Sequence, residues 1–331
     1  MKTHQVQQKT ERRISAALRL VFVAALLLGQ IALAFFLSTE LRQRAAIIYT
    51  VLELAAFGYA VRIYNRTDGA SYKFGWIFLV LTVPVVGLIL YFLWNGDRQQ
   101  KRLDLKKLPM PEEPEAQQAA HRIQMEKLRR KFPQWERLSV YLSRQGYLLY
   151  GDTETTYLPT GEMFLQDMLE KLEQAEHFIF LEFFIIAQGQ IWDRMEEIFR
   201  RKAAAGVEVK ILFDDFGSMM RFPAGQIEAL RESGVEVQVF NPVHHYVNRL
   251  YFNYRDHRKI VCIDGSTAYT GGANVADEYA NLTVRFGYWK DCGIRLDGPG
   301  AWGLTREFLH MWQRNGGQLM QERDYYRPHD H

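Results

Sequence analysis

The sequence predicts an α/β protein in which N-terminal transmembrane helices precede one lobe, a mixed β-sheet flanked by helices. Long apolar segments occur only in the first 95 residues, and strand and helix patterns alternate from residue 157 onward with short connections. We therefore expect three parts: a membrane anchor over 1–95, a linker with an amphipathic helix over 96–146, and the lobe over 147–331.

The anchor contains three apolar segments, over 20–37, 45–61 and 74–94. A hydrocarbon core about 30 Å thick needs about 20 apolar residues in a helix, which favours the first and third segments. The second is weaker because Glu53 interrupts it and would need a partner in the membrane. Two or three spans therefore stay open. The distribution of basic residues leaves the orientation open as well, with a lean toward tails in the cytoplasm.

Charge divides the chain in the same place as hydropathy. The whole chain has a net charge of +3, but residues 1–95 carry 10 basic and 4 acidic residues, whereas residues 96–331 carry 31 basic and 34 acidic ones. A mildly acidic lobe argues against a body that coats nucleic acid. Two cysteines, Cys262 and Cys292, are too few for a disulfide framework or a structural zinc site.

The segment after the anchor is a charged, proline-containing linker close to the membrane, and residues 121–146 then predict one amphipathic helix. In the lobe, apolar runs predict strands and helical spacing predicts helices. We expect strands over 178–186, 207–213 and 235–240, and helices over 190–205 and 225–233.

The segment 253–279 contains the candidate site. A β-type run over 258–263, the turn dipeptide Asp264-Gly265 and a returning strand over 266–270 predict a β-hairpin. Residues two apart on a strand share a face, so His257 and Lys259 are expected to point the same way. Gly272 and Asn274, beyond the far end of the hairpin, would add backbone N–H groups and an amide to a phosphate-binding site.

Three nearby residues leave alternatives open. Asp264 lies in the turn, so a structural role is favoured over acid–base chemistry. Arg255 could bind phosphate or pair with an acid. Glu182 interrupts an apolar strand and therefore needs a partner or a position in a cleft.

His257, Lys259 and Asp264 match the pattern H-x-K-x4-D, and the chain thereby resembles the phospholipase D superfamily. The segments NYRDHRKIVCIDG, YTGGANVADEY and FGYWKD resemble the first half of a bacterial cardiolipin synthase, and the resemblance extends over residues 49–312. Within this family Gly272 and Asn274 fall next to the signature. Glu278 is a candidate to orient the imidazole.

This resemblance implies phosphatidyl transfer without a metal or another cofactor. One histidine attacks phosphatidylglycerol and releases glycerol, and a second phosphatidylglycerol then accepts the phosphatidyl group to give cardiolipin. Such an enzyme would be a multi-pass protein of the bacterial cell membrane with its catalytic domain in the cytoplasm. Its partners would be phosphatidylglycerol and other membrane lipids, and no nucleic acid.

Members of the family carry two H-x-K signatures at a shared site, but the other eight histidines of this chain are not followed two positions later by lysine. We therefore expect His257 to supply half a site. Three explanations stay open: a truncated product, a homodimer with one histidine from each copy, and a partner chain with the second half. The alternative functions are an inactive or regulatory lipid-binding half-domain and a phospholipase D-like phosphodiesterase or nuclease.

Overall fold

The computed structural model describes residues 42–66, 69–94, 115–223, 225–242, 255–285, 287–319 and 325–327, together with isolated helical positions between 24 and 35. Most of the first expected span, 20–37, and most of the expected linker lie outside the described residues. The chain divides into two units, of which the first contains the described residues up to 94 and the second contains those from 115 onward.

In the first unit, three helices follow one another: α2 (Arg42–Tyr64), α3 (Ala70–Thr82) and α4 (Pro84–Trp94). Among the described residues one helical stretch, Ile47–Tyr64, has the length and apolar composition to cross a membrane. The second expected span therefore coincides with most of α2. Multiple transmembrane helices are not established by the described residues.

The third expected span, 74–94, is divided by Pro84 into two shorter helices. Proline lacks a backbone N–H and disfavours helical geometry in the residue before it, and Val83 accordingly leaves the helical region at φ −132°. A Cβ atom on Gly87 would lie 2.5 Å from the carbonyl oxygen of Leu79. The chain therefore turns sharply here, and the one span expected over 74–94 is instead two helices, α3 and α4.

The second unit contains one seven-stranded mixed sheet in the order β1-β7-β6-β5-β2-β3-β4. Strands β2, β3 and β4 run parallel, whereas the pairs from β1 to β2 are antiparallel. The strands are β1 (Glu154–Leu158), β2 (Phe178–Phe183), β3 (Glu208–Asp214), β4 (Glu236–Phe240), β5 (Ile260–Ile263), β6 (Thr267–Gly271) and β7 (Gly293–Asp297).

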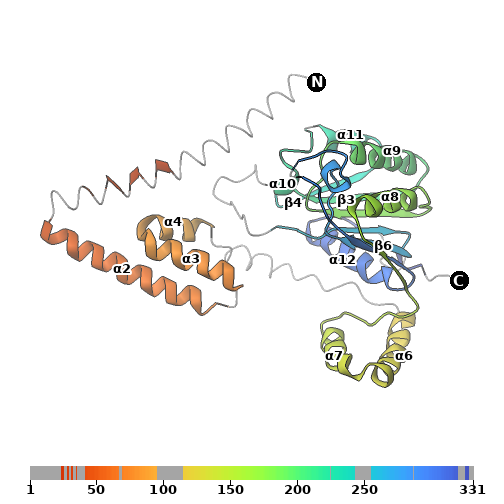
Figure 1. The fold of residues 1–331 in the computed structure, drawn as a ribbon, viewed down its shortest axis with the longest axis horizontal. Helices are drawn as coiled ribbons and strands as arrows, with labels where there is room; N and C mark the ends of the chain where they lie inside the picture. The colour runs from red at the N-terminus through yellow and green to blue at the C-terminus, as the bar shows by residue number, and fades with distance from the viewer. Residues whose placement is uncertain are drawn as a thin grey trace. The chain divides into compact units, whose positions relative to one another are not determined.

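Helices cover both faces of this sheet, as Figure 1 shows. The helices around the sheet are α8 (Gly161–Leu172), α9 (Gln190–Ala204), α10 (Asp215–Ser218), α11 (Gln226–Glu232), the short η2 (Asp277–Ala280) and α12 (Ala301–Arg314). On one face, the main hydrophobic core joins the alternate β2 residues Ile179 and Leu181 to α8 and α9. On the other face, Phe180 stacks on Phe308 of α12 with ring centroids 4.8 Å apart. A strand covered on both faces explains the continuous apolar run in the sequence. The predicted mixed sheet flanked by helices is confirmed.

The expected helix over 121–146 is two helices joined by a single 3-10 turn. They are α6 (Glu115–Lys131), η1 (Pro133–Trp135) and α7 (Glu136–Arg144). Pro133 again explains the break, because the preceding Phe132 leaves the helical region with φ −140°.

Candidate active site

The predicted hairpin is present and is built from β5 and β6. These strands pair antiparallel, with Ile260 opposite Thr270 and Ile263 opposite Thr267. Both Asp264 and Gly265 have positive φ angles, 51° and 71°, which an Asp-Gly turn tolerates better than most dipeptides. His257 lies three residues before β5, in an extended segment.

His257 and Lys259 face the same place, as their spacing predicts. The ammonium Nζ of Lys259 lies 3.2 Å from Nδ1 of His257 and donates a hydrogen bond of 2.7 Å to the His257 carbonyl oxygen. The Phe184 ring, just beyond β2, is tilted against the imidazole with centroids 4.8 Å apart. Lys259 is buried, whereas His257 is exposed, so the imidazole is the reachable member of the pair.

The surroundings favour a neutral imidazole. Burial, together with the positive charge of Lys259, lowers the pKa of His257 from its ordinary value. Burial also lowers the pKa of Lys259 to about 8, although the carboxylates of Asp256 and Asp291 act in the opposite direction. At pH 7 the site therefore presents an uncharged imidazole beside an ammonium group, which suits a nucleophile that must approach an anionic phosphate.

The segment that carries His257 is tied to the end of β3. Oδ2 of the fully buried Asp214 accepts a 2.9 Å hydrogen bond from the backbone N–H of Asp256, the residue before His257. Oδ1 of the same carboxylate accepts a bond from Arg255 at 3.2 Å and caps α10 through the N–H of Phe216 at 2.9 Å. Of the two alternatives for Arg255, pairing with an acid is the one that the structure shows.

Asp264 lies at the opposite end of β5 from His257. Its carboxylate accepts three backbone hydrogen bonds of 2.8 Å, from Glu176, His177 and Phe178 at the start of β2. These bonds join the hairpin turn to the neighbouring strand. These contacts support the structural role that the turn position favours over acid–base chemistry, and that role stays a prediction.

The glycine-rich segment after β6 differs from the prediction in one respect. The N–H of Gly272 donates to the Cys292 carbonyl oxygen at 3.1 Å, so the expected free donor at Gly272 is absent. A Cβ atom there would lie 2.2 Å from Oδ1 of Asp291, so any larger residue would require the Asp291 side chain to move. Buried Asn274 accepts from the Ile185 N–H at 3.0 Å and donates to the Tyr279 hydroxyl at 2.8 Å. Phosphate binding by Asn274 stays a prediction.

Glu278 is held by two arginines. It accepts a 2.7 Å bond from Arg221 and a 3.4 Å bond from Arg285. Burial acts to raise the pKa of Glu278, but the hydrogen bonds to Arg221 and to the backbone and the positive charges of Arg221 and Arg285 together outweigh it, so the pKa lies below its usual value. Among the described residues, Glu278 thus forms ion pairs with Arg221 and Arg285. None of its recorded contacts there is with His257, which the sequence suggests that it orients.

A buried acidic cluster beside the site was only partly foreseen. Arg258 contacts Glu182 at 2.7 Å, Glu307 of α12 at 2.9 Å and Asp256 at 3.4 Å. Burial raises the pKa of the completely buried Glu182 carboxyl well above its usual range, although Arg258 acts to lower it. The charged residue in an apolar strand gave the signal for Glu182, whereas no local pattern pointed to Glu307.

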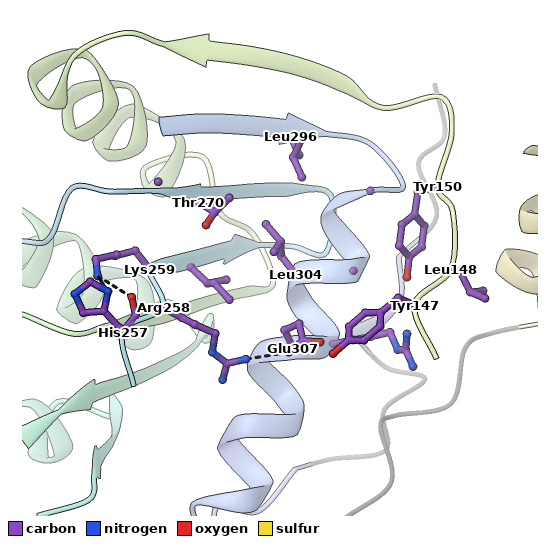
Figure 2. A pocket seen from close by; sticks show the side chains of 15 residues that line it. Tyr147, Leu148, Tyr150, His257, Arg258, Lys259, Thr270, Leu296, Leu304 and Glu307 are labelled. Carbon is purple, nitrogen blue, oxygen red and sulfur yellow. Dashed lines mark hydrogen bonds and ion pairs between the residues drawn. The ribbon is translucent and has the colours of Figure 1, made fainter. Parts of the chain in front are cut away.

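Both signature residues line a cleft of about 610 Å³. Figure 2 shows His257 and Lys259 at one end of this cleft and Tyr147, Leu148 and Tyr150 at the other. The cleft thus joins a cationic, nucleophilic end to an end where apolar and aromatic side chains lie beside the charged Glu307. Such a shape can accept a molecule with an anionic head and a nonpolar part.

The two cysteines lie in different surroundings. Cys262 is fully buried, and burial raises the pKa of its thiol to about 12, whereas Cys292 is exposed; both are free. Across the described part of the chain, the His, Cys, Asp and Glu side chains form no group of three that could hold a metal ion.

Family models match two regions of the chain. Residues 168–284 match the model described as "Cardiolipin synthase, PLD-like domain", and residues 54–95 match "Phospholipase_D-nuclease N-terminal". The first match contains β2–β6 and the His257–Lys259 pair. The second contains the C-terminal part of α2 and all of α3 and α4.

Similar proteins extend the match over most of this chain. An uncharacterized protein of Streptococcus mutans is 37% identical over 241 residues, covering 72% of this chain and 51% of that protein. Cardiolipin synthase 2 of Bacillus anthracis is 31% identical (82% of this chain, 53% of that one), and the major cardiolipin synthase ClsA of Bacillus subtilis is 30% identical (76% and 53%). The chain spans about half the length of these curated relatives. It belongs to the phospholipase D superfamily, in the family of the bacterial cardiolipin synthases.

Proposed function

We propose that this chain supplies one histidine half-site of a membrane-associated phosphatidyltransferase. The enzyme would make cardiolipin and glycerol from two molecules of phosphatidylglycerol. The observation that carries the proposal is the exposed imidazole of His257 with the Lys259 ammonium 3.2 Å from its Nδ1, at the end of a cleft with an apolar continuation. The names of the similar proteins support the same reaction class.

The first step is attack of an imidazole nitrogen lone pair of His257 on phosphorus. The phosphate of the lipid would take over hydrogen bonds that Lys259 now makes to His257, which frees the imidazole and places the cation on the phosphoryl oxygens. A P–N bond forms as the bond from phosphorus to the glycerol oxygen breaks. The glycerol oxygen takes a proton from an acid, and phosphatidyl-His257 remains.

The second step reverses the direction of proton transfer. The group that donated the proton removes one from the hydroxyl of a second phosphatidylglycerol, whose oxygen attacks phosphorus and displaces His257. A second histidine suits both roles because it can carry and release a proton near neutral pH. Since this sequence contains one H-x-K signature, we place that histidine on a second copy of the chain or on a second catalytic half, either continuous with this sequence or carried by another chain.

The proposed role of His257 can be tested by chemical trapping. In mixed micelles with fluorescent phosphatidylglycerol, the chain, alone or together with the C-terminal half of a similar cardiolipin synthase, should form fluorescent cardiolipin, release glycerol and remain active in the presence of EDTA. Quenching with denaturant at neutral pH, which preserves the acid-labile P–N bond, followed by mass spectrometry should find the phosphatidyl group on His257. His257→Ala should abolish both the adduct and the product, while Cys292→Ser, an exposed control, should preserve them. An adduct on another residue, or cardiolipin formation by His257→Ala, would contradict the proposal.

The source of the second histidine requires a separate measurement. If two copies share a site, activity should fall with the square of protein concentration on dilution below the dissociation constant, and the active species should be a dimer. If a separate half is needed, the chain alone should be inactive and should recover activity with the C-terminal half of a similar cardiolipin synthase.

The half-length match favours one alternative function, a lipid-binding half-domain without catalysis. A monomer that binds phosphatidylglycerol, forms no adduct and stays inactive with a second half would support it. Because the family match includes the N-terminal helical region, we also propose that the chain resides in the bacterial cell membrane as a multi-pass protein, with the sheet-containing unit in the cytoplasm.

A further inference from the structure

The two-helix segment over 115–147, here called the α6–α7 hairpin, presents its apolar residues to the outside. Trp135, Leu138, Tyr141 and Leu142 recur at helical spacing and are 54%, 49%, 60% and 39% exposed. No residue of α7 is buried. A helix on the surface of a soluble domain normally turns such a stripe toward the core, so the arrangement in α7 is reversed.

Exposed apolar groups also occur elsewhere in the α6–α7 hairpin. Phe132, in the connection between the helices, is 53% exposed, and Ile123 of α6 is 58% exposed. Together with the α7 stripe they form a concentration of large apolar and aromatic side chains. Isolated exposed apolar residues are normal, but a concentration of this kind marks a surface that contacts another phase or molecule.

The α6–α7 hairpin is nevertheless attached to its unit and folded on itself. His121 of α6 accepts the N–H of Leu149 at 2.9 Å and lies 3.1 Å from the Ser143 hydroxyl of α7. Gln117 donates a 2.9 Å hydrogen bond to the Tyr326 hydroxyl. These contacts fix the polar side of the helices, so the apolar side is exposed by the packing itself.

The charge of the α6–α7 hairpin differs from that of the rest of its unit. Residues 115–147 contain seven basic and three acidic residues, whereas residues 96–331 as a whole contain 31 and 34. Two of the three glutamates are neutralised within the hairpin, by the pairs Arg129–Glu136 at 2.7 Å and Arg130–Glu126 at 3.8 Å. The positive excess is therefore local, and it complements an anionic surface.

We propose that the α6–α7 hairpin lies in the interfacial layer of a bilayer that contains anionic phospholipid. Tryptophan and tyrosine beside basic residues match this layer, where rings meet the acyl boundary and cations meet phosphate groups. Chain connectivity agrees, because Glu115 follows the apolar helix that ends at Trp94 by 21 positions. A lipid surface is favoured over a protein partner because the apolar stripe and the positive charge occur in the same short segment.

The proposal can be tested with the full chain reconstituted in vesicles. In a Cys292→Ser background, Leu138→Cys would carry an environment-sensitive fluorophore, since the remaining Cys262 is buried. The control probe would be Glu197→Cys, at an exposed position of α9. The vesicles would be phosphatidylcholine alone or equal parts of phosphatidylcholine and phosphatidylglycerol.

In the phosphatidylglycerol vesicles, the probe at Leu138 should shift to the blue and be quenched by nitroxide-labelled acyl chains. The probe at Glu197 should be quenched by aqueous iodide instead. Because a basic residue near an anionic surface adds an electrostatic preference of about fivefold, Arg130→Gln should lower the ratio of inserted to exposed probe about fivefold. High salt should act in the same direction.

Three outcomes would overturn the proposal. The probe at Leu138 could be accessible to iodide in both kinds of vesicle, which would exclude insertion. It could insert equally in both, which would exclude the role of anionic lipid. Its blue shift could persist in detergent without lipid and increase with protein concentration, which would assign the surface to a second copy of the chain. The catalytic proposal is not involved, because the measurement does not depend on turnover.

Discussion

Replacing Asp264 with alanine should lower the free energy of unfolding of the lobe and leave the catalytic activity of the folded molecules unchanged. The carboxylate holds three backbone N–H groups at 2.8 Å, two of them in exposed surroundings. At about 1 kcal/mol for each, the loss is about 3 kcal/mol. Alanine also tolerates the φ of 51° poorly, which adds about 1 kcal/mol.

Asp264→Asn is the matched control. Asparagine accepts the positive φ and keeps one acceptor oxygen, so it should lose about half as much stability. For a lobe of this size, 1 kcal/mol corresponds to about 2–4 °C, so thermal unfolding in detergent should show Tm falling by about 10 °C for alanine and about 5 °C for asparagine. At low temperature, where the variants are folded, the rate of turnover divided by the number of molecules that form phosphatidyl-His257 should be unchanged. An unchanged Tm together with lost turnover would refute the structural assignment and place Asp264 in the chemistry.

Three further predictions concern the site and its support. Because the pKa of Lys259 is about 8, the KM for phosphatidylglycerol should rise as the pH passes 8 and the ammonium loses its proton. The Lys259→Arg variant keeps its positive charge in this range, so its KM should not show the rise. Glu182→Gln should lower the free energy of unfolding in urea by less than about 1 kcal/mol, because the pKa of the buried carboxyl is raised. Arg258→Met should lower it by about 3 kcal/mol, because Glu182 and Glu307 lose the cation that they share. Similar losses for the two variants would contradict this assignment. Gly293→Ala should destabilise the lobe by about 1–3 kcal/mol, because the new Cβ would lie 2.3 Å from the buried Phe164 ring; an unchanged Tm would show that the ring moves freely.

The sequence predicted the parts of the site that depend on local geometry. The two-residue spacing placed His257 with Lys259, and Asp264-Gly265 predicted the turn. The apolar run from Phe178 predicted a strand, and the structure shows that this strand is buried on both faces.

The remaining features depend on contacts between distant segments. Nothing near Gly272 shows that the Cys292 carbonyl will occupy its N–H, because that bond forms only when β7 pairs with β6. The partner of Arg255 lies 41 positions away at the end of β3. Pro133 was visible in the sequence, but an amphipathic pattern that continues through a proline does not reveal that the chain reverses there.

The order of strands in the sheet determines when His257 can be positioned while the chain is being synthesised. Strand β5 pairs antiparallel with β2, so the start of β5 lies beside the ends of β2 and β3, where Phe184 and Asp214 meet the His257 segment. A nascent chain that has completed β2–β4 therefore holds the receiving surface but lacks the nucleophile. His257 and Lys259 are two residues apart, so they are synthesised together. The orientation of the imidazole, however, is fixed only when β5 pairs with β2. Reactivity toward lipid should thus be among the last properties that the growing chain gains.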